Sequence, residues 1–125
     1  MALTRAQINS KITQLTREKN NCASERTKYK NSLTYAQKLV KTLNNSSTYL
    51  VTSNDYIKRF FTVNNKTADG GKINSTKENI NQIIKKLNNT IIPSINSNIN
   101  NLTTRINNID REINKLKRDL QTAKA

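Results

Sequence analysis

Histidine and tryptophan are absent from this chain of 125 residues, which has one Cys, one Pro and two Gly. Without histidine it lacks the commonest general base and the commonest metal ligand in proteins. A lone Cys cannot form a cysteine–histidine nucleophile pair. The eight acidic residues are scattered, and the nearest pair, Asp110 and Glu112, does not share a helix face. We therefore predict that the protein is not an enzyme and uses no metal and no cofactor.

The scarcity of glycine and proline favours long helices over a fold rich in turns. Apolar residues recur in the first half of the chain with a period of seven, which is typical of a coiled-coil seam. The seam positions are Ile8, Leu15, Cys22, Tyr29, Ala36, Leu43, Leu50 and Ile57, alternating with Ile12, Lys19, Arg26, Leu33, Val40, Ser47, Asn54 and Phe61.

A second seam follows, after a turn expected at Asp69-Gly70-Gly71. Its positions are Ile73, Ile80, Ile84, Leu87 and Ile91, then, after one extra residue near Pro93, Ile95, Ile99, Leu102, Ile106, Ile109, Ile113, Leu116, Leu120 and Ala123. The sequence thus predicts an all-α fold, a long antiparallel helical hairpin that resembles a coiled coil. We expect one domain over residues 1–125, with a first arm at about 4–61, a loop at about 62–73 and a second arm at about 74–122. Capping boxes at Thr4 with Gln7 and at Ser75 with Glu78 mark the two helix starts.

If the chain folds back at this loop, residues whose numbers add to about 134 come level with one another. Lys19 then lies near 112–115 and Arg26 near 107–110, so both seam cations meet the acidic residues of the second arm. Pro93 comes level with Lys41, next to the weakly helical stretch 44–48, and the second seam slips by one residue at the same height. We expect a kink or break near the middle of the arms.

Pairs of adjacent apolar residues widen the seam in the half nearer the loop. A strict seam suits two helices, whereas a wider stripe suits a bundle of three or more. Apolar residues make up 34% of the chain, and a hairpin buries only one stripe on each arm, so self-association or a partner is expected. The predicted partner-binding residues are Leu39, Leu50, Val51, Phe60, Ile83 and Ile92.

The net charge of +14 is compatible with a nucleic acid, an anionic membrane surface or an acidic protein as partner. The basic residues are spread along both arms rather than gathered at one end, which disfavours a basic-region zipper. Neither arm has the broad apolar face, rich in Trp or Phe, of a helix that lies on a membrane. Protein binding is the preferred interpretation, and specific nucleic-acid binding and membrane insertion are not expected.

Cys22 stands at a seam position, where a small apolar side chain packs well. A buried thiol is the favoured interpretation, and a disulfide across a symmetric dimer is the alternative. A polar helix already begins at Thr4, and no run of residues reaches transmembrane length. The sequence therefore predicts a cytoplasmic protein that, if exported, leaves without a cleavable leader.

Two segments, 60–73 (FFTVNNKTADGGKI) and 87–96 (LNNTIIPSIN), resemble the YwqH-like family of small helical proteins of Gram-positive bacteria. These proteins are associated with toxins that carry an LXG domain. The resemblance implies an adaptor or chaperone that binds the helical LXG domain, together with a second small helical protein, and helps to target the toxin to the type VII secretion system.

Two features of related secreted hairpins are missing. There is no Trp-x-Gly turn, and no Phe or Tyr is followed four residues later by Asp or Glu. The resemblance then implies that the export signal lies on a partner. Two other functions remain open from the residues alone: a self-associating structural coiled coil of a phage or cell envelope, and, less favoured, a basic nucleic-acid-binding protein.

Overall fold

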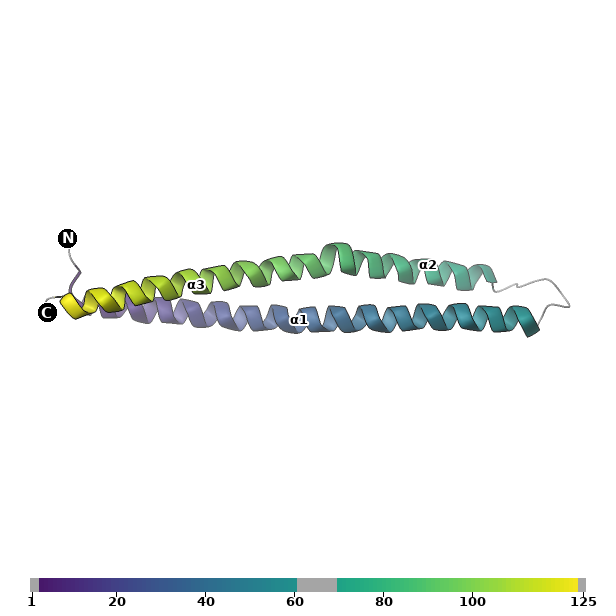
Figure 1. Ribbon diagram of the computed structural model, residues 1–125, viewed down its shortest axis with the longest axis horizontal. Coiled ribbons are helices and arrows are strands. Elements are labelled where there is room, and N and C mark those ends of the chain that lie inside the picture. Colours follow the sequence, from purple (N-terminus) through teal and green to yellow (C-terminus); the bar gives the residue numbers. More distant parts are fainter. Residues whose placement is uncertain (1–2, 61–69, 124–125) are drawn as a thin grey trace. The chain divides into compact units, whose positions relative to one another are not determined.

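The computed structural model describes residues 3–60 and 70–123, and in this part of the chain the fold is all-α. Helix α1 spans Arg5–Phe60, α2 spans Gly70–Lys86 and α3 spans Ile92–Thr122. A π-helical turn, η1, at Leu87–Ile91 joins α2 to α3 without a break in the helix. Figure 1 traces α1, α2, η1 and α3 along the chain. The predicted fold class is confirmed.

A capping box closes the start of α1. The backbone N–H of Thr4 donates to Oε1 of Gln7 at 2.9 Å, and the backbone N–H of Gln7 donates to Oγ1 of Thr4 at 3.3 Å. The carbonyl of Thr4 accepts the first helical bond, from the N–H of Ile8. These bonds satisfy donors that a helix start leaves without partners. The capping box predicted at this end is confirmed.

The seam positions predicted for the first arm, which recur with a period of seven, form the buried side of α1. From residue 4 to residue 55, every seam position is buried or half-buried, and Ala23 and Ser53 are the other residues of this stretch that are not exposed. The pattern holds even where the seam residue is Lys19, Arg26 or Asn54. Position in the repeat therefore determines burial along α1 more strongly than the polarity of the side chain.

The extra residue in the second seam is absorbed by η1. The N–H of Ile92 donates to the carbonyl of Leu87, five residues back instead of the four of an α-helix. Ile92, half-buried, therefore follows the buried Leu87 in the seam, while Ile91 is 38% exposed. The prediction that Ile91 belongs to the seam is wrong. The irregularity expected near mid-arm occurs in the second arm as a π turn, and α1 passes through residues 44–48 without interruption.

Close packing divides the chain into two units, which are described separately. The first unit consists of Met1–Asn31 and Ile95–Ala125, and the second consists of Ser32–Ser94. The sequence led us to expect a single hairpin domain. Each unit is compact in its own contacts, and α1 contributes its first half to one unit and its second half to the other. The single domain stays a prediction.

The pairing of the arms in the first unit differs from the predicted one. Nζ of Lys19 lies 2.6 Å from Oδ1 of Asp110, and Nη1 of Arg26 donates to Oγ1 of Thr103 at 3.2 Å. Level residues thus have numbers that add to about 129 rather than about 134. Lys19 does meet an acidic residue of the second arm, although Asp110 comes before the stretch 112–115. The prediction that Arg26 lies near 107–110 is wrong.

The helix ends explain this difference in pairing. α1 ends at Phe60 and α2 begins at Gly70, so the interval between them is centred on residue 65. The glycine pair, which the sequence analysis placed in the turn, instead stands in the first turn of α2. The predicted loop lies mostly in 61–69, outside the described residues, and the second arm starts earlier than the predicted position near residue 74.

Candidate partner-binding surface

The first unit has a filled apolar core. A cluster of buried side chains in this unit comprises Cys22, Leu102, Ile106, Ile109 and Ile113, all at most 7% exposed. Partly buried apolar side chains pack against the cluster: Ile12, Leu15, Ala23 and Tyr29. Cys22 is a free, buried thiol, as the favoured interpretation predicted. Two short arms in this unit thus cover their apolar seam with each other.

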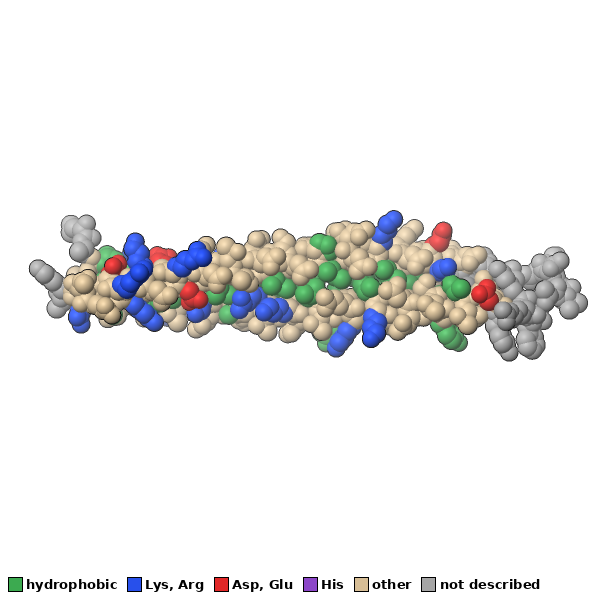
Figure 2. Space-filling model, viewed as in Figure 1, with side chains coloured by type: hydrophobic (Ala, Val, Ile, Leu, Met, Phe, Trp, Pro, Cys, Tyr) green, Lys and Arg blue, Asp and Glu red, His purple; other side chains and the backbone are tan. Residues whose placement is uncertain are grey.

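The second unit buries far less. Among its described side chains, Ala36, Leu87 and Asn54 are the buried ones. All the large hydrophobic residues found exposed in the described part of the chain belong to this unit: Tyr35, Leu39, Tyr49, Val51, Ile83 and Ile91. In Figure 2, hydrophobic side chains reach the surface along the line where α1 and α2 run beside each other. Exposed apolar surface of this kind on a polar chain is a candidate for an interaction site.

Some of the predicted partner-binding residues lie on this surface. Leu39 is 45% exposed, Ile83 is 49% exposed and Val51 is 37% exposed. Leu50 and Ile92 are half-buried, because each occupies the seam position of its apolar pair. Phe60 is the last residue of α1, and its side chain lies outside the described ones.

Two tyrosines were missed by the reasoning from sequence. Tyr35 and Tyr49 are 77% and 73% exposed, and they are the most exposed large hydrophobic residues of the described chain. Tyr35 directly precedes Ala36 and Tyr49 directly precedes Leu50, but tyrosine carries a hydroxyl group and was not counted in an apolar pair. Their separation by two heptads was the signal that would have found them, because it places both on one face of α1.

These tyrosines belong to a continuous uncharged stripe beside the seam of α1. We call it the second stripe, and its members alternate in steps of three and four residues: Ser32, Tyr35, Leu39, Thr42, Ser46, Tyr49 and Ser53. All are exposed except Ser53, which is half-buried. The same heptad positions in the first unit hold Lys11, Gln14, Glu18, Asn21, Glu25 and Lys28. The repeat is the same, but the second unit has no charge there.

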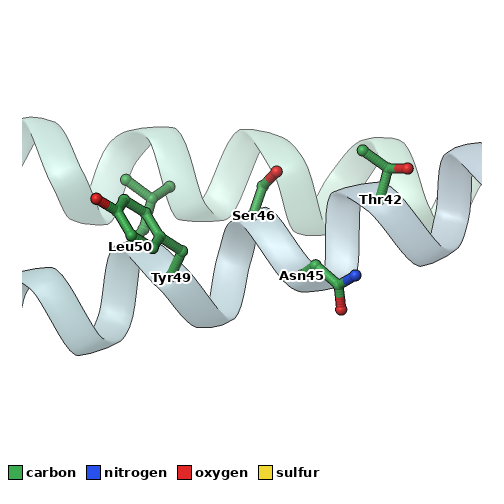
Figure 3. A pocket seen from close by; sticks show the side chains of 5 residues that line it. All are labelled: Thr42, Asn45, Ser46, Tyr49 and Leu50. Carbon is green, nitrogen blue, oxygen red and sulfur yellow. The ribbon is translucent and has the colours of Figure 1, made fainter.

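A hollow lies in the second stripe. Its lining consists of Thr42, Asn45, Ser46, Tyr49 and Leu50. Figure 3 shows all five on consecutive turns of α1, with Tyr49 close to Leu50 at one end and Thr42 at the other. The first four are spaced as residues i, i+3, i+4 and i+7, which is the set of four that forms the hole for a knob in packed helices. The short side chains of Thr42 and Ser46 leave this hole unfilled.

The first unit has a hollow at the equivalent place, three heptads earlier. It is lined by Asn21, Ser24, Glu25, Lys28 and Tyr29, which match the other hollow position for position. Here Glu25 and Lys28 occupy the places of Ser46 and Tyr49. The charged residues would have to lose their hydration for an apolar side chain to enter. The two hollows therefore share their geometry but differ in what they can accept.

The same flank also differs in its ion pairs. In the first unit Nη2 of Arg105 on α3 lies 3.4 Å from Oε1 of Glu18, a residue of the charged stripe. Each of these residues comes directly before a seam residue of its helix. Ile83 likewise comes directly before the seam residue Ile84. Ile83 therefore occupies the same heptad position as Arg105. It lies on the same side of the seam as the second stripe, across from the leucine and serines of that stripe.

Asn54 is the polar member of the second unit's core. It is 8% exposed, and its Oδ1 has no hydrogen-bond partner among the described residues. A buried polar atom without a partner costs about 1–3 kcal/mol. A buried Asn at one seam position is a known means of fixing the register of paired helices. Asn54 therefore weakens the second unit.

The described residues contain no group of three or more potential metal ligands among His, Cys, Asp and Glu. In the same part of the chain, no helix combines the length and the apolarity needed to cross a bilayer. The class that the fold defines is a helical hairpin with one closed and one open unit. Comparison with family models, with curated proteins and with solved structures finds no match to this chain.

Proposed function

We propose that this chain is a non-catalytic adaptor whose second unit binds helices of another protein. The observation that carries the proposal is the confinement of the exposed large hydrophobic residues to one unit. Apolar surface removed from water contributes roughly 25 cal/mol per Å², so an exposed stripe of this kind favours association. The filled core of the first unit supplies the stable part of the hairpin that carries this surface.

The partner that we propose is the helical LXG domain of a toxin, which the chain helps to target to the type VII secretion system, with a second small helical protein in the same complex. Support for this comes from the resemblance of segments 60–73 and 87–96 to the YwqH-like family. The open stripe supports it too, because a helical domain is the kind of partner that a seam with knob-accepting holes receives.

The test is co-expression with the helical N-terminal region of an LXG toxin encoded beside this chain, followed by purification through a tag on the toxin. The unaltered chain is expected to co-purify. The double variant Leu39→Glu/Ile83→Glu is expected to lose the complex, because two carboxylates would enter an apolar contact. The control, Gln14→Glu/Asn101→Glu, adds the same charge at exposed positions of the first unit and is expected to retain the complex.

A chain that never co-purifies with such a region would exclude the toxin partner. Sedimentation of the chain alone tests the rival function, a self-associating structural coiled coil. A stable symmetric oligomer that has no affinity for the toxin region would favour that rival. Binding to a nucleic acid that persists at physiological salt would favour the remaining alternative.

A further inference from the structure

We infer that the second stripe, with its hollow at Thr42–Tyr49, receives one α-helix of a different polypeptide, and that acidic residues border the apolar side of that helix. This inference rests on the proposed adaptor function and specifies the chemistry of the partner. The proposed occupant of the stripe is an acidic amphipathic helix rather than a second copy of this chain.

The shape of the surface selects a helix. The stripe runs in steps of three and four residues from Ser32 to Ser53, so it matches the spacing of side chains on a helix laid along it. At 1.5 Å per residue the stripe is about 31 Å long, which corresponds to about three heptads of a partner. The hollow between Thr42 and Tyr49 is a four-residue hole, and it would receive one aliphatic side chain near the middle of that helix.

The two exposed tyrosines provide the flat apolar area at this surface. Tyr35 and Tyr49 stand on either side of Thr42, one heptad away in each direction. Tyrosine is enriched at the centres of protein interfaces, because it buries a large area and loses few rotamers. A helix on the stripe would cover both rings and leave their hydroxyl groups at the rim.

The charges of the second unit select an acidic partner. Its described side chains include the cations Lys38, Lys41, Lys77, Lys85 and Lys86, but only two acidic ones, Asp55 and Glu78. None of these cations forms an ion pair with a described residue, whereas Lys19 and Arg105 of the first unit do. Opposite charges on a partner would both speed the encounter and fix its register.

Two of these lysines border the proposed contact directly. Lys38 comes just before Leu39 on α1, on the outer edge of the second stripe, and Lys86 lies one turn after Ile83 on α2. A helix between these lysines would present Glu or Asp at positions next to its apolar residues. Lysine side chains are long enough to keep their charge in water while their stems cover the partner.

A second copy does not fit this pattern. It would bring a further net charge of +14 and the same uncompensated lysines to the contact. Like charges facing each other across an interface lower the affinity. If two copies paired through the second stripe, Lys38 of each copy would approach the surface of the other copy, which already carries Lys41 and Lys86.

The experiment uses the full chain and two synthetic 21-residue helical peptides with fluorescent labels. Both carry Leu in alternating steps of three and four residues; the bordering positions are Glu in one peptide and Lys in the other. Fluorescence anisotropy is measured at low and at high NaCl concentration. We expect the Glu peptide to bind at least tenfold more tightly than the Lys peptide, with a preference that declines as salt screens the charges.

Exchanging the contents of the two hollows provides matched variants. The variant Ser46→Glu/Tyr49→Lys gives the second unit's hollow the charges found in the first, without altering the net charge. We expect it to weaken Glu-peptide binding at least tenfold. The reciprocal variant, Glu25→Ser/Lys28→Tyr, is expected to leave the affinity at the second stripe unchanged. Circular dichroism checks that both variants fold, which is expected because all four replaced residues are exposed.

The lysines are tested in the same way. Lys38→Glu/Lys86→Glu is expected to reverse the preference between the two peptides, while Lys11→Glu/Lys115→Glu, with the same change of charge in the first unit, retains it. Equal binding of both peptides, or binding of neither, would overturn the inference. A dimer of the chain alone that Ser46→Glu/Tyr49→Lys abolishes would also overturn it, in favour of a second copy. Co-purification with the toxin region that is insensitive to the Lys38 and Lys86 changes would leave the adaptor function standing and reject the acidic helix.

Discussion

Both units have the same seven-residue repeat, but they differ in how many side chains are buried and in the residues beside the seam. In the first unit, the cluster around Cys22 and Ile106 fills the space between the helices, and charged residues such as Glu25 and Lys28 occupy the stripe beside the seam. In the second unit few described residues are buried, and the corresponding stripe holds Tyr35, Leu39 and Tyr49 in water. A heptad repeat therefore sets where two helices meet. The residues next to the seam decide whether the surface beside the pair is charged, as in the first unit, or apolar, as in the second.

The largest expected effect is a difference between the two units in the free energy of unfolding that is lost when a seam side chain is truncated to alanine. Ile106→Ala removes a side chain that is 6% exposed from the first core, and we expect a loss of about 2–4 kcal/mol in the free energy of unfolding. Ile84→Ala removes a half-buried side chain from the second unit and is expected to cost about 1 kcal/mol. Urea denaturation followed by circular dichroism measures both, and equal losses would contradict the contrast between the units.

The π turn of the second unit gives the next effect. Deleting Asn89 removes the extra residue and places Pro93 inside a regular α-helix, where its ring clashes with a carbonyl and one hydrogen bond is missing. We expect a loss of about 3 kcal/mol, most of which Pro93→Ala recovers in the same background. Thermal unfolding of the three chains measures this. If the deletion remained as damaging without the proline, the extra residue would have a role beyond keeping the seam aligned.

Asn54 offers a way to strengthen the weaker unit. Replacing it by Leu removes a buried oxygen that has no partner among the described residues, and we expect a gain of about 1–2 kcal/mol in the free energy of unfolding. The exposed Asn44 is the matched control, and Asn44→Leu is expected to gain only a few tenths of a kcal/mol from helix propensity. A loss on Asn54→Leu, measured by urea denaturation, would show that the amide is satisfied.

The smallest effect concerns the ion pair between Lys19 and Asp110 in the first unit. Their side chains are 37% and 41% exposed, so water screens the attraction, and we expect a coupling of about 0.5 kcal/mol. A double-mutant cycle with Lys19→Met and Asp110→Asn measures this coupling, which should decline in 1 M salt. A coupling above about 2 kcal/mol would mean that the pair, rather than the apolar cluster, determines the pairing of the arms.

Much of the fold was accessible from sequence, because helix formation and seam position depend on local patterns. The capping box at Thr4 and the burial of Ile8, Cys22 and Ala36 at seam positions were predicted correctly. The exposure of part of the candidate surface was also accessible: the apolar pairs included Leu39, Val51 and Ile83, which are exposed in the structure. That these residues bind a partner stays a prediction. The tyrosines were missed because each carries a hydroxyl group and was not counted in an apolar pair, although Tyr35 directly precedes Ala36 and Tyr49 directly precedes Leu50.

The sequence by itself determined that this protein is helical and that two arms meet along a heptad seam. It also determined that pairs of adjacent apolar residues widen the seam in one half of the chain. The tertiary structure decided which member of the pair Ile91 and Ile92 turns inward and which acidic residue meets Lys19. The physical reason is that one residue turns a helix by about 100°, so a single π turn exchanges Ile91 for Ile92 at the seam. The level at which the arms pair follows from where the helices end, and no local pattern encodes that position.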